Sequence, residues 1–179
     1  MKVLVIGESC RDIFYYGECD RLCPDAPVPV FKGSFVKSNG GMAKNVQENL
    51  NSLGVTTTIL TNENWESIIK TRYVDLKSNH MFLRVDENDN TYGSLKKETL
   101  KEIDFLSYDA VVVSDYNKNF LSIEILSEIS KLHPITFLDT KKILGQWHEE
   151  YKYIKINSKE YENTKHTLNN AILNKLIIT

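Results

Sequence analysis

The feature that most limits the fold of this chain is an alternation of short apolar runs with stretches of helical spacing. Residues 3–6 are fully apolar and end at Gly7, which is typical of a buried parallel strand. Residues 110–113 form a second such run, which ends at the polar pair Ser114-Asp115. Four further segments have strand-like character, at residues 56–60, 135–138, 153–156 and 176–178.

Helical patterns lie between these predicted strands. After Gly40-Gly41, apolar residues follow at spacings of 4, 4 and 3, at positions 42, 46, 50 and 53, and Gly54 stands where a C-terminal cap belongs. A second helix is predicted over residues 121–132, before Pro134. Strands that alternate with helices imply right-handed βαβ crossovers. We therefore expect a three-layer, Rossmann-like α/β fold with a parallel sheet covered on both faces.

Two segments break this alternation, at approximately residues 26–38 and 70–92. Both alternate apolar with other residues, and Ser78-Asn79 is a plausible turn within the second. We expect solvent-facing antiparallel strands, which would make a small β lid or a dimer surface. At 179 residues, the whole chain, 1–179, is expected to be a single domain.

Composition and charge exclude several classes of protein. Lys+Arg 22 against Asp+Glu 24 gives a net charge of −2, so there is no electrostatic case for nucleic acid or an anionic membrane as partner. The longest purely apolar runs have four residues, whereas a membrane span needs about 20. We expect a cytoplasmic protein.

The cysteine pattern also favours a cytoplasmic protein. Cys10, Cys19 and Cys23 are odd in number and lie in one short stretch, unlike the even set of a secreted disulfide framework. Cys19 and Cys23 could be two ligands of a zinc ion, but the four histidines stand alone. Reduced thiols are therefore favoured, and no tightly bound metal is expected.

Polar residues that follow the predicted strands are the first candidates for a site. In parallel α/β sheets, ligands bind beyond the carboxyl ends of the strands. The residues in such positions are Glu8, Asp12, Asp115, Asp139 and Asn157.

A series of motifs in fixed order resembles the PfkB/ribokinase family of carbohydrate kinases. It begins with Gly-Glu-Ser-Cys-Arg-Asp at 7–12, Arg-Leu-Cys-Pro-Asp-Ala-Pro-Val-Pro-Val at 21–30 and Gly-Gly-Met-Ala-Lys-Asn-Val at 40–46. It continues with Leu-Arg-Val-Asp at 83–86, Ser-Asp-Tyr-Asn-Lys at 114–118, Asp-Thr-Lys at 139–141 and Asn-Ser-Lys-Glu-Tyr-Glu at 157–162. Each motif is weak alone, but their common order is not expected by chance.

The Pro-Asp-Ala-Pro-Val-Pro-Val phrase is closest to the branch of this family that phosphorylates heptose 7-phosphate on the route to ADP-heptose. The resemblance implies a ribokinase-like fold. It also implies transfer of phosphate from ATP, with Mg²⁺, to a hydroxyl of a sugar or sugar phosphate.

The resemblance implies sugar-binding roles for Asp12, Gly40, Gly41 and Asn45. The Asp12 carboxylate would accept hydrogen bonds from two sugar hydroxyls; the alternative is an ordinary turn or cap aspartate. The two glycines would let the backbone approach a ligand, and they also suit a tight turn. The Asn45 amide offers a donor and an acceptor, but is otherwise an ordinary helix residue.

Five further residues are candidates on the same ground. Arg84 and Lys118 would meet a phosphate on the substrate, although exposed basic residues are usually only solvated. Asp139, Asn157 and Glu160 would lie at the nucleotide and Mg²⁺ site, since a carboxylate suits Mg²⁺. The alternative for Asn157 and Glu160 is a simple helix start with Asn157 as the cap.

The sequence departs from the family in two places. Only residues 61–69 follow the strand at 56–60, where the family inserts a further helix–strand unit, so one crossover is expected to be missing. The catalytic Gly-Ala-Gly-Asp tetrapeptide of the family does not occur, and no residue is assigned as the catalytic base. We therefore expect a domain truncated at its C-terminal end, because phosphoryl transfer depends on stabilising the transferring group.

Several hypotheses remain. The first is a heptose-phosphate-type sugar kinase that is incomplete or inactive as a lone chain. The second is a sugar-phosphate-binding or regulatory module, or one half of a split kinase whose partner supplies the C-terminal half. An unrelated Rossmann-type nucleotide-binding protein is disfavoured, because residues 7–10 lack the glycine fingerprint. A homodimer through the β lid, or through the apolar strand at 176–178, is also expected.

Overall fold

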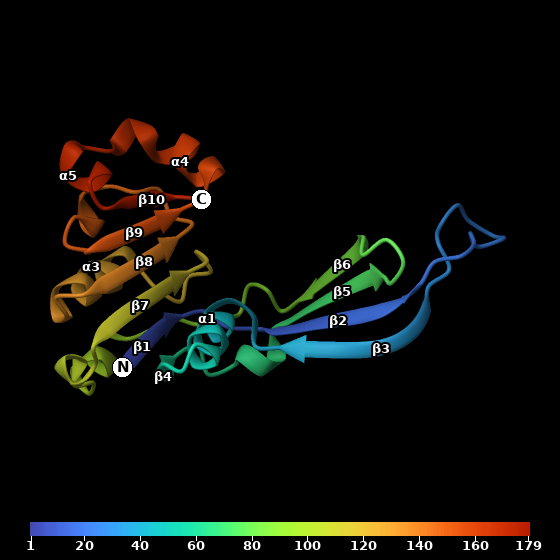
Figure 1. Cartoon of the computed structure of the whole chain (residues 1–179), viewed down its shortest axis with the longest axis horizontal. Coiled ribbons are helices and arrows are strands. Elements are labelled where there is room, and N and C mark those ends of the chain that lie inside the picture. The colour runs from blue at the N-terminus through green and yellow to red at the C-terminus, as the bar shows by residue number, and fades with distance from the viewer.

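The larger part of the molecule is a six-stranded parallel sheet, as seen in a computed structural model that describes residues 1–179 (Figure 1). Its order is β10-β9-β8-β7-β1-β4. The strands are β1 (Lys2–Gly7), β4 (Thr56–Leu60), β7 (Ala110–Asp115), β8 (Thr136–Thr140), β9 (Tyr153–Ile156) and β10 (Leu176–Ile178). All six strands predicted from apolar runs are present, and every pairing between them is parallel.

One face of this sheet is covered by α3 (Ile123–Leu132) and the short elements around it. Ser122 caps α3 by accepting the Ile125 N–H at 3.2 Å. The apolar side of α3 packs with β1, β7, β8 and β9 in a core of 21 buried residues. The remaining helices are α2 (Lys97–Lys101), α4 (Ser158–Thr164) and α5 (Asn170–Leu173). No helix combines the length and apolar character that crossing a bilayer requires.

The other face is covered only in part. The helix α1 (Gly41–Ser52) packs its Ala43, Val46 and Leu50 against the strands β1, β4 and β7. Over β8, β9 and β10 no helix lies on this side, and Phe137, Tyr153 and Ile177 are 37%, 38% and 48% exposed. The expectation of a sheet covered on both faces is therefore met only over half of this face.

The strands β1 and β7 approach each other closely at their carboxyl ends. A Cβ atom on Gly7 would lie 2.0 Å from the Ser114 carbonyl oxygen. Only glycine fits this position, because a real Cβ atom cannot come so near to backbone. This close approach lies at the carboxyl ends of β1 and β7, next to the point where the chain leaves the parallel sheet for the lid.

The second sheet extends as an arm from the parallel sheet (Figure 1). Its order is β3-β2-β5-β6, formed by β3 (Lys32–Asn39), β2 (Arg11–Glu18), β5 (Ile69–Asp75) and β6 (Met81–Glu87). The hairpin predicted within residues 70–92 is β5 and β6, and Asn79 in its turn has a φ of 55°, which asparagine tolerates.

The small sheet corrects the expectation of a purely antiparallel lid. β2 pairs with β3 in antiparallel and with β5 in parallel orientation, so the lid is mixed. The segment predicted at 26–38 contributes one strand, which begins only at Lys32. β2 itself was not predicted, although Ile13-Phe14-Tyr15-Tyr16 is an unbroken apolar run of the same length as those that predicted β1 and β7.

Candidate functional site at the root of the lid

The lid joins the parallel sheet at the carboxyl ends of β1 and β7, where ligands bind in folds of this kind. Glu8 follows β1 directly and is fully buried. Its carboxylate accepts the backbone N–H groups of Tyr116 at 2.8 Å and of Lys118 at 3.0 Å. Burial raises the pKa of Glu8, and the nearby charge of Asp115 adds to the rise. Glu8 therefore fixes the loop after β7, and with it the position of Lys118.

Gly41 brings the backbone before α1 against this site. Its φ is +52°, and a Cβ atom there would lie 2.7 Å from Cys10 Sγ and 3.6 Å from Asp12 Cβ. The Gly41 N–H donates to Asn39 Oδ1 at 2.8 Å. Met42 also has a positive φ, of 44°, which an ordinary side chain rarely adopts. The loop therefore reaches Asp12 through a strained backbone that glycine at position 41 makes possible.

Gly40 and Asn45 flank this contact. The Gly40 carbonyl accepts the Cys10 N–H at 3.1 Å, which ties the loop to the start of the lid. Asn45 lies in the first turn of α1 and is half-buried, and its amide makes no side-chain hydrogen bond within the protein. A role for either residue in holding a sugar stays a prediction.

Asp12 is buried and forms a two-pronged ion pair. Arg72 Nε lies 2.8 Å from Asp12 Oδ1, and Arg72 Nη2 lies 3.1 Å from Oδ2. The Arg72 guanidinium also lies 5.3 Å from the centre of the Phe14 ring. Asp12 is therefore no ordinary turn residue. Its carboxylate is held in one orientation by the two arginine donors, and a role in holding a sugar stays a prediction.

The charged residues of the lid share one face and lie in register. Asp12 of β2 lies opposite Lys70 of β5, which lies opposite Asp86 of β6. Residues opposite one another point to the same face of a sheet. The next row on this face holds Phe14, Arg72 and Arg84.

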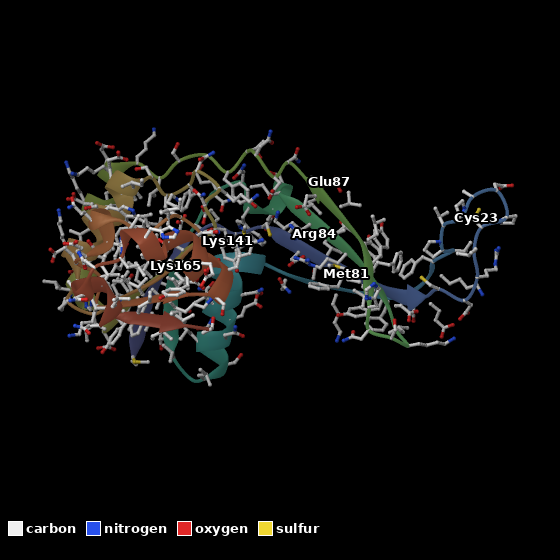
Figure 2. The ribbon with its side chains drawn as sticks, turned by 90° about the horizontal axis from the view of Figure 1, so that it is seen from above. Cys23, Met81, Arg84, Glu87, Lys141 and Lys165 are labelled. Atoms are coloured by element: carbon white, nitrogen blue, oxygen red, sulfur yellow. The ribbon has the colours of Figure 1, made fainter.

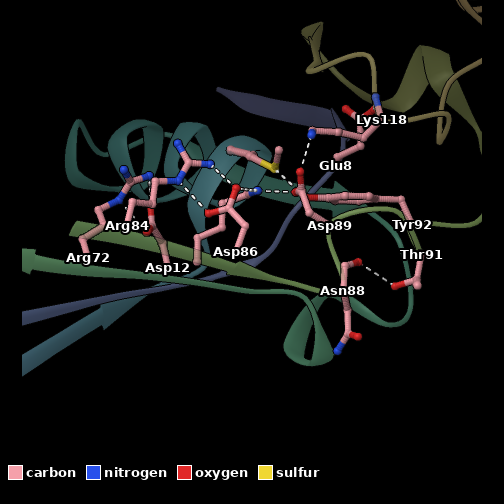
Figure 3. Close-up of polar contacts among 12 residues, drawn as sticks. Glu8, Asp12, Arg72, Arg84, Asp86, Asn88, Asp89, Thr91, Tyr92 and Lys118 are labelled. Carbon is pink, nitrogen blue, oxygen red and sulfur yellow. Dashed lines mark hydrogen bonds and ion pairs between the residues drawn. The ribbon is translucent and has the colours of Figure 1, made fainter.

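These rows continue into a network that reaches the parallel sheet (Figure 3). Arg84 donates to both oxygens of Asp86, each at 2.7 Å, and these bonds lower the pKa of Asp86. Lys70 Nζ lies 3.3 Å from Asp86 Oδ2 and also contacts Asp89. Lys118, from the loop after β7, contacts the other oxygen of Asp89. The structure thus brings the predicted Arg84 and Lys118 into one ion-paired group through Asp86, Lys70 and Asp89. The Asp12–Arg72 pair lies beside this group on the same face of the lid.

Four charged residues here were not predicted as site residues from the sequence: Lys70, Arg72, Asp86 and Asp89. Lys70 and Arg72 are two residues apart on a predicted strand, so their common face was open to inference. Their pairing with Asp12 was not, because it needs the parallel contact of β2 with β5. Asp89 lies in a loop, and no local pattern places it.

Asp115 and its neighbours form a separate buried group. Asp115 is 1% exposed, and Lys142 Nζ lies 2.8 Å and 3.0 Å from its two oxygens. Thr140 donates to Asp115 Oδ2 as well. The Asn117 N–H also donates to Asp115 Oδ1, so both oxygens of this carboxylate have partners within the protein.

The three predicted nucleotide-site residues lie at the ends of β8 and β9. Asn157 Oδ1 accepts the Glu160 N–H, and Glu160 Oε2 accepts the Asn157 N–H, both at 2.8 Å. This is a reciprocal cap of α4. Asp139 lies 3.2 Å from Lys155 Nζ, and its partial burial raises the pKa of Asp139 in spite of this lysine. The helix-cap alternative is therefore present, and a role toward Mg²⁺ or nucleotide stays a prediction.

The three cysteines are free thiols. Cys10 is buried beside Gly41, and burial raises the pKa of its thiol to about 11. Its sulfur stays protonated and unreactive at neutral pH. Cys23 lies near the far end of the arm, away from the network (Figure 2). No group of three or more His, Cys, Asp and Glu side chains is placed to hold a metal ion.

The comparisons with known proteins agree with this architecture. No protein-family model matches the chain. In fold, the chain is similar to a carbohydrate kinase from Agrobacterium tumefaciens, with a TM-score of 0.59, 14% identity and coverage of 99% of this chain and 69% of that one. It is also similar to a ribokinase from Thermotoga maritima, with a TM-score of 0.54, 15% identity and coverage of 98% and 70%. The chain has the ribokinase-like fold.

The sequence comparison is more specific. The chain is 30% identical to the bifunctional protein HldE of Helicobacter pylori over 204 positions, which cover 92% of this chain and 43% of HldE. It is 32% identical to HldE of Hyphomonas neptunium over 164 positions, with coverage of 73% and 33%. The chain thus spans less than half the length of these relatives. The resemblance to ribokinase-like carbohydrate kinases is confirmed.

The alignment with the H. pylori protein also concerns the helix–strand unit that is expected to be missing after the strand at residues 56–60. Its 204 positions exceed the 179 residues of this chain, so the H. pylori protein has additional residues within the matched region. In this structure, the short 3₁₀ turn Trp65–Ser67 is the only helical element between β4 and β5. A cavity of about 600 Å³ lies beside it, lined mainly by residues 60–64 and 91–96.

Proposed function

We propose that this chain binds the acceptor sugar of a ribokinase-like carbohydrate kinase, and that the ligand is a sugar phosphate of the heptose 7-phosphate type. The observation that carries the proposal is the position of Gly41, where an added Cβ would lie 3.6 Å from Asp12 Cβ, beyond the carboxyl end of β1 and under a lid that carries several cations. The sequence similarity to HldE supports the heptose-phosphate branch.

In this proposal, Asp12 orients the sugar. Arg72 holds the carboxylate through two donors, and the remaining lone pairs accept hydrogen bonds from two neighbouring hydroxyls. The amide of Asn45 binds a third hydroxyl, and Gly40 and Gly41 leave room for the ring. Arg84 and Lys118 attract the phosphate.

ATP with Mg²⁺ would supply the phosphoryl group, on the side of Asp139, Asn157 and Glu160. The donor set fits a loosely held ion. The Asp139 side chain is 44% exposed, and the second carboxylate oxygen of Glu160 is not used by the helix cap. Mg²⁺ commonly keeps several waters and takes few protein ligands. No tightly bound metal is proposed.

Phosphoryl transfer needs residues that this chain does not contain. The 179 residues include no Gly-Ala-Gly-Asp sequence, and removal of a single oxyanion donor can already cost about 10²–10³ in rate. We propose that a second polypeptide segment supplies this half. The alternative is a sugar-phosphate-binding module with a regulatory role, in the cytoplasm in either case.

A homodimer through the lid is a further part of the proposal. The face of the lid opposite Asp12 carries Val36, Leu83 and Val85, which are 53%, 49% and 39% exposed. Exposed apolar sheet faces favour association. Light scattering at about 10–100 µM tests it, and a monodisperse monomer would count against it.

The experiment for sugar binding compares heptose 7-phosphate with the free sugar in a thermal-shift series. Asp12→Asn keeps the size of the side chain and removes its charge. We expect the ligand to stabilise the wild type and to have no effect on Asp12→Asn. Asp25→Asn is the matched control, because Asp25 is exposed and makes no ion pair. An unchanged ligand response in Asp12→Asn contradicts the proposal.

A coupled assay for ADP release separates the two forms of the proposal. We expect no turnover by this chain alone with ATP and heptose 7-phosphate. Turnover that appears on adding a polypeptide with the Gly-Ala-Gly-Asp motif supports the split kinase. Binding without turnover under every such pairing favours the regulatory module.

A further inference from the structure

The network under the lid contains a lysine that is almost fully removed from water. The Lys70 side chain is 5% exposed. Its ammonium is held by two carboxylates, Asp86 of the neighbouring strand and Asp89 of the loop that follows it. A buried ammonium needs such partners, because removing an ion from water costs on the order of several kcal/mol inside a protein. Any ligand that displaces one of them must bring negative charge of its own.

Asp89 lies between two ammonium groups from different parts of the molecule. Lys70 belongs to the lid and contacts one oxygen of Asp89. Lys118 follows β7 of the parallel sheet and contacts the other oxygen (Figure 3). The Tyr92 hydroxyl donates to Asp89 Oδ1 at 2.9 Å. Burial opposes the charge of Asp89, but the bonds from Lys118 and Lys70 lower its pKa to about 2. Asp89 is thus an anion that ties the lid to the sheet.

The three carboxylates under the lid, two in the network and Asp12 beside it, differ in how they are held. Asp12 and Asp86 are each gripped by two donors of one arginine, a planar arrangement with fixed geometry. Asp89 has no arginine partner. Lysine acts as a point charge with rotatable donors and does not require a carboxylate in a fixed orientation. Another anion can therefore take the position of Asp89 between the two lysines.

The charges and the access favour such an exchange. Three cations, Lys70, Arg84 and Lys118, are linked by ion pairs to two carboxylates, those of Asp86 and Asp89. The network therefore has an excess positive charge. The side chains of Lys118 and Asp89 are 33% and 24% exposed, so solvent reaches this end of the network. The residue before Asp89, Asn88, has a φ of 57°, which marks a turn.

We propose that Lys70 and Lys118 form a phosphate-binding subsite, and that the Asp89 carboxylate occupies it in place of the phosphate when no ligand is bound. A phosphate brings more negative charge than one carboxylate and more acceptor oxygens, so it replaces Asp89 between the two ammonium groups. Asp89 then turns toward solvent, and the direct tie between the lid and the loop after β7 is released. A neutral sugar cannot make this exchange.

The identity of the ligand as a sugar phosphate rests on the proposed function, but the subsite is testable without a sugar. Inorganic phosphate is titrated by calorimetry at constant ionic strength, with sodium chloride as the reference. Asp89→Asn removes the competing charge at nearly constant volume. We expect it to bind phosphate about tenfold or more tightly than the wild type, which is the effect of one hydrogen bond to a charged group.

Asp20→Asn is the matched control. Asp20 also lies between two lysines of the arm, 2.8 Å from Lys77 and 3.9 Å from Lys32, so this change removes the same charge from between two exposed lysines. We expect its phosphate affinity to stay within about twofold of the wild type, because general attraction through solvent is screened. An equal gain in Asp20→Asn would mean that only net charge matters, and would overturn the proposal.

Lys118→Gln supplies a test that does not depend on the folding of Asp89→Asn. Lys118 lies at the exposed end of the network, and we expect its replacement by glutamine to lower phosphate affinity by about tenfold or more. Unchanged affinity in Lys118→Gln, or the absence of phosphate binding in both the wild type and a folded Asp89→Asn, overturns the proposal. Phosphate binding without any effect of Asp12→Asn on the sugar phosphate would instead leave the subsite standing and refute the sugar site.

Discussion

The ion pair between Asp12 and Arg72 should contribute both to the stability of the fold and to the binding of sugar phosphate. Substitutions at these two positions can separate the two contributions. Arg72→Met keeps an unbranched side chain over Phe14 but leaves the Asp12 carboxylate without its partner. The Asp12 and Arg72 side chains are 10% and 19% exposed. Loss of one partner from a buried pair costs about 3–5 kcal/mol, and the residual exposure favours the lower end.

We therefore expect Arg72→Met to lower the free energy of unfolding by about 3 kcal/mol, or Tm by about 6–12 °C for a chain of this size. Urea unfolding followed by circular dichroism measures it. Arg84→Met is the matched control, because Arg84 pairs with Asp86 at 40% exposure. We expect that change to cost less than about 1 kcal/mol.

The double variant Asp12→Leu, Arg72→Met completes the experiment. Replacing both members of a buried pair by apolar groups is often neutral for stability, so the double variant should be more stable than Arg72→Met. It should nevertheless bind no sugar phosphate. A stability loss below about 0.5 kcal/mol in Arg72→Met, or no recovery in the double variant, would refute the view of Asp12 as a buried, pair-dependent carboxylate.

Two further predictions concern other positions. His148 is fully buried, its Nε2 has no partner, and burial lowers its pKa from 6.5 to about 4. The unfolded chain therefore binds a proton more readily. The stability that neutral His148 provides should be complete above about pH 6.5 and should fall by up to about 3 kcal/mol toward pH 4. His148→Phe should flatten this part of the pH–stability curve, and an unchanged curve would refute the assignment. Gly41→Ala should destabilise the chain and abolish sugar-phosphate binding, since a Cβ would lie 2.7 Å from Cys10 Sγ. Gly93→Ala is its control, because Gly93 has a φ of +70° but nothing within 4 Å. Equal losses of binding in the two variants would mean that backbone strain alone, and not the approach to the site, is responsible.

The parallel sheet was predictable because its strands are buried. The runs that became β1 and β7 are apolar throughout, as strands covered by other elements must be, and a glycine or proline marks the ends of several of them. The lid was predictable only in part. Its β5–β6 hairpin has alternation and a turn, whereas the aromatic run of β2 has neither.

The site shows the same division. Asp12, Gly41 and Lys118 were predicted as site residues from motifs; the structure places Gly41 beside Asp12 and joins Lys118 to the lid through Asp89. Their partners Arg72 and Asp89 could not be found in this way, because each contact joins segments that are far apart in the sequence. The pairing of Asp12 with Arg72 spans 60 positions and that of Lys118 with Asp89 spans 29. Local periodicity carries no information on such pairings.

Direct calorimetric titration of this 179-residue chain with heptose 7-phosphate, without ATP, is the most direct test of the proposed sugar site. We expect saturable binding with one ligand per chain, weakened by Asp12→Asn and far weaker for the unphosphorylated heptose. The absence of binding at millimolar ligand, or equal affinity for the phosphorylated and free sugars, would contradict it.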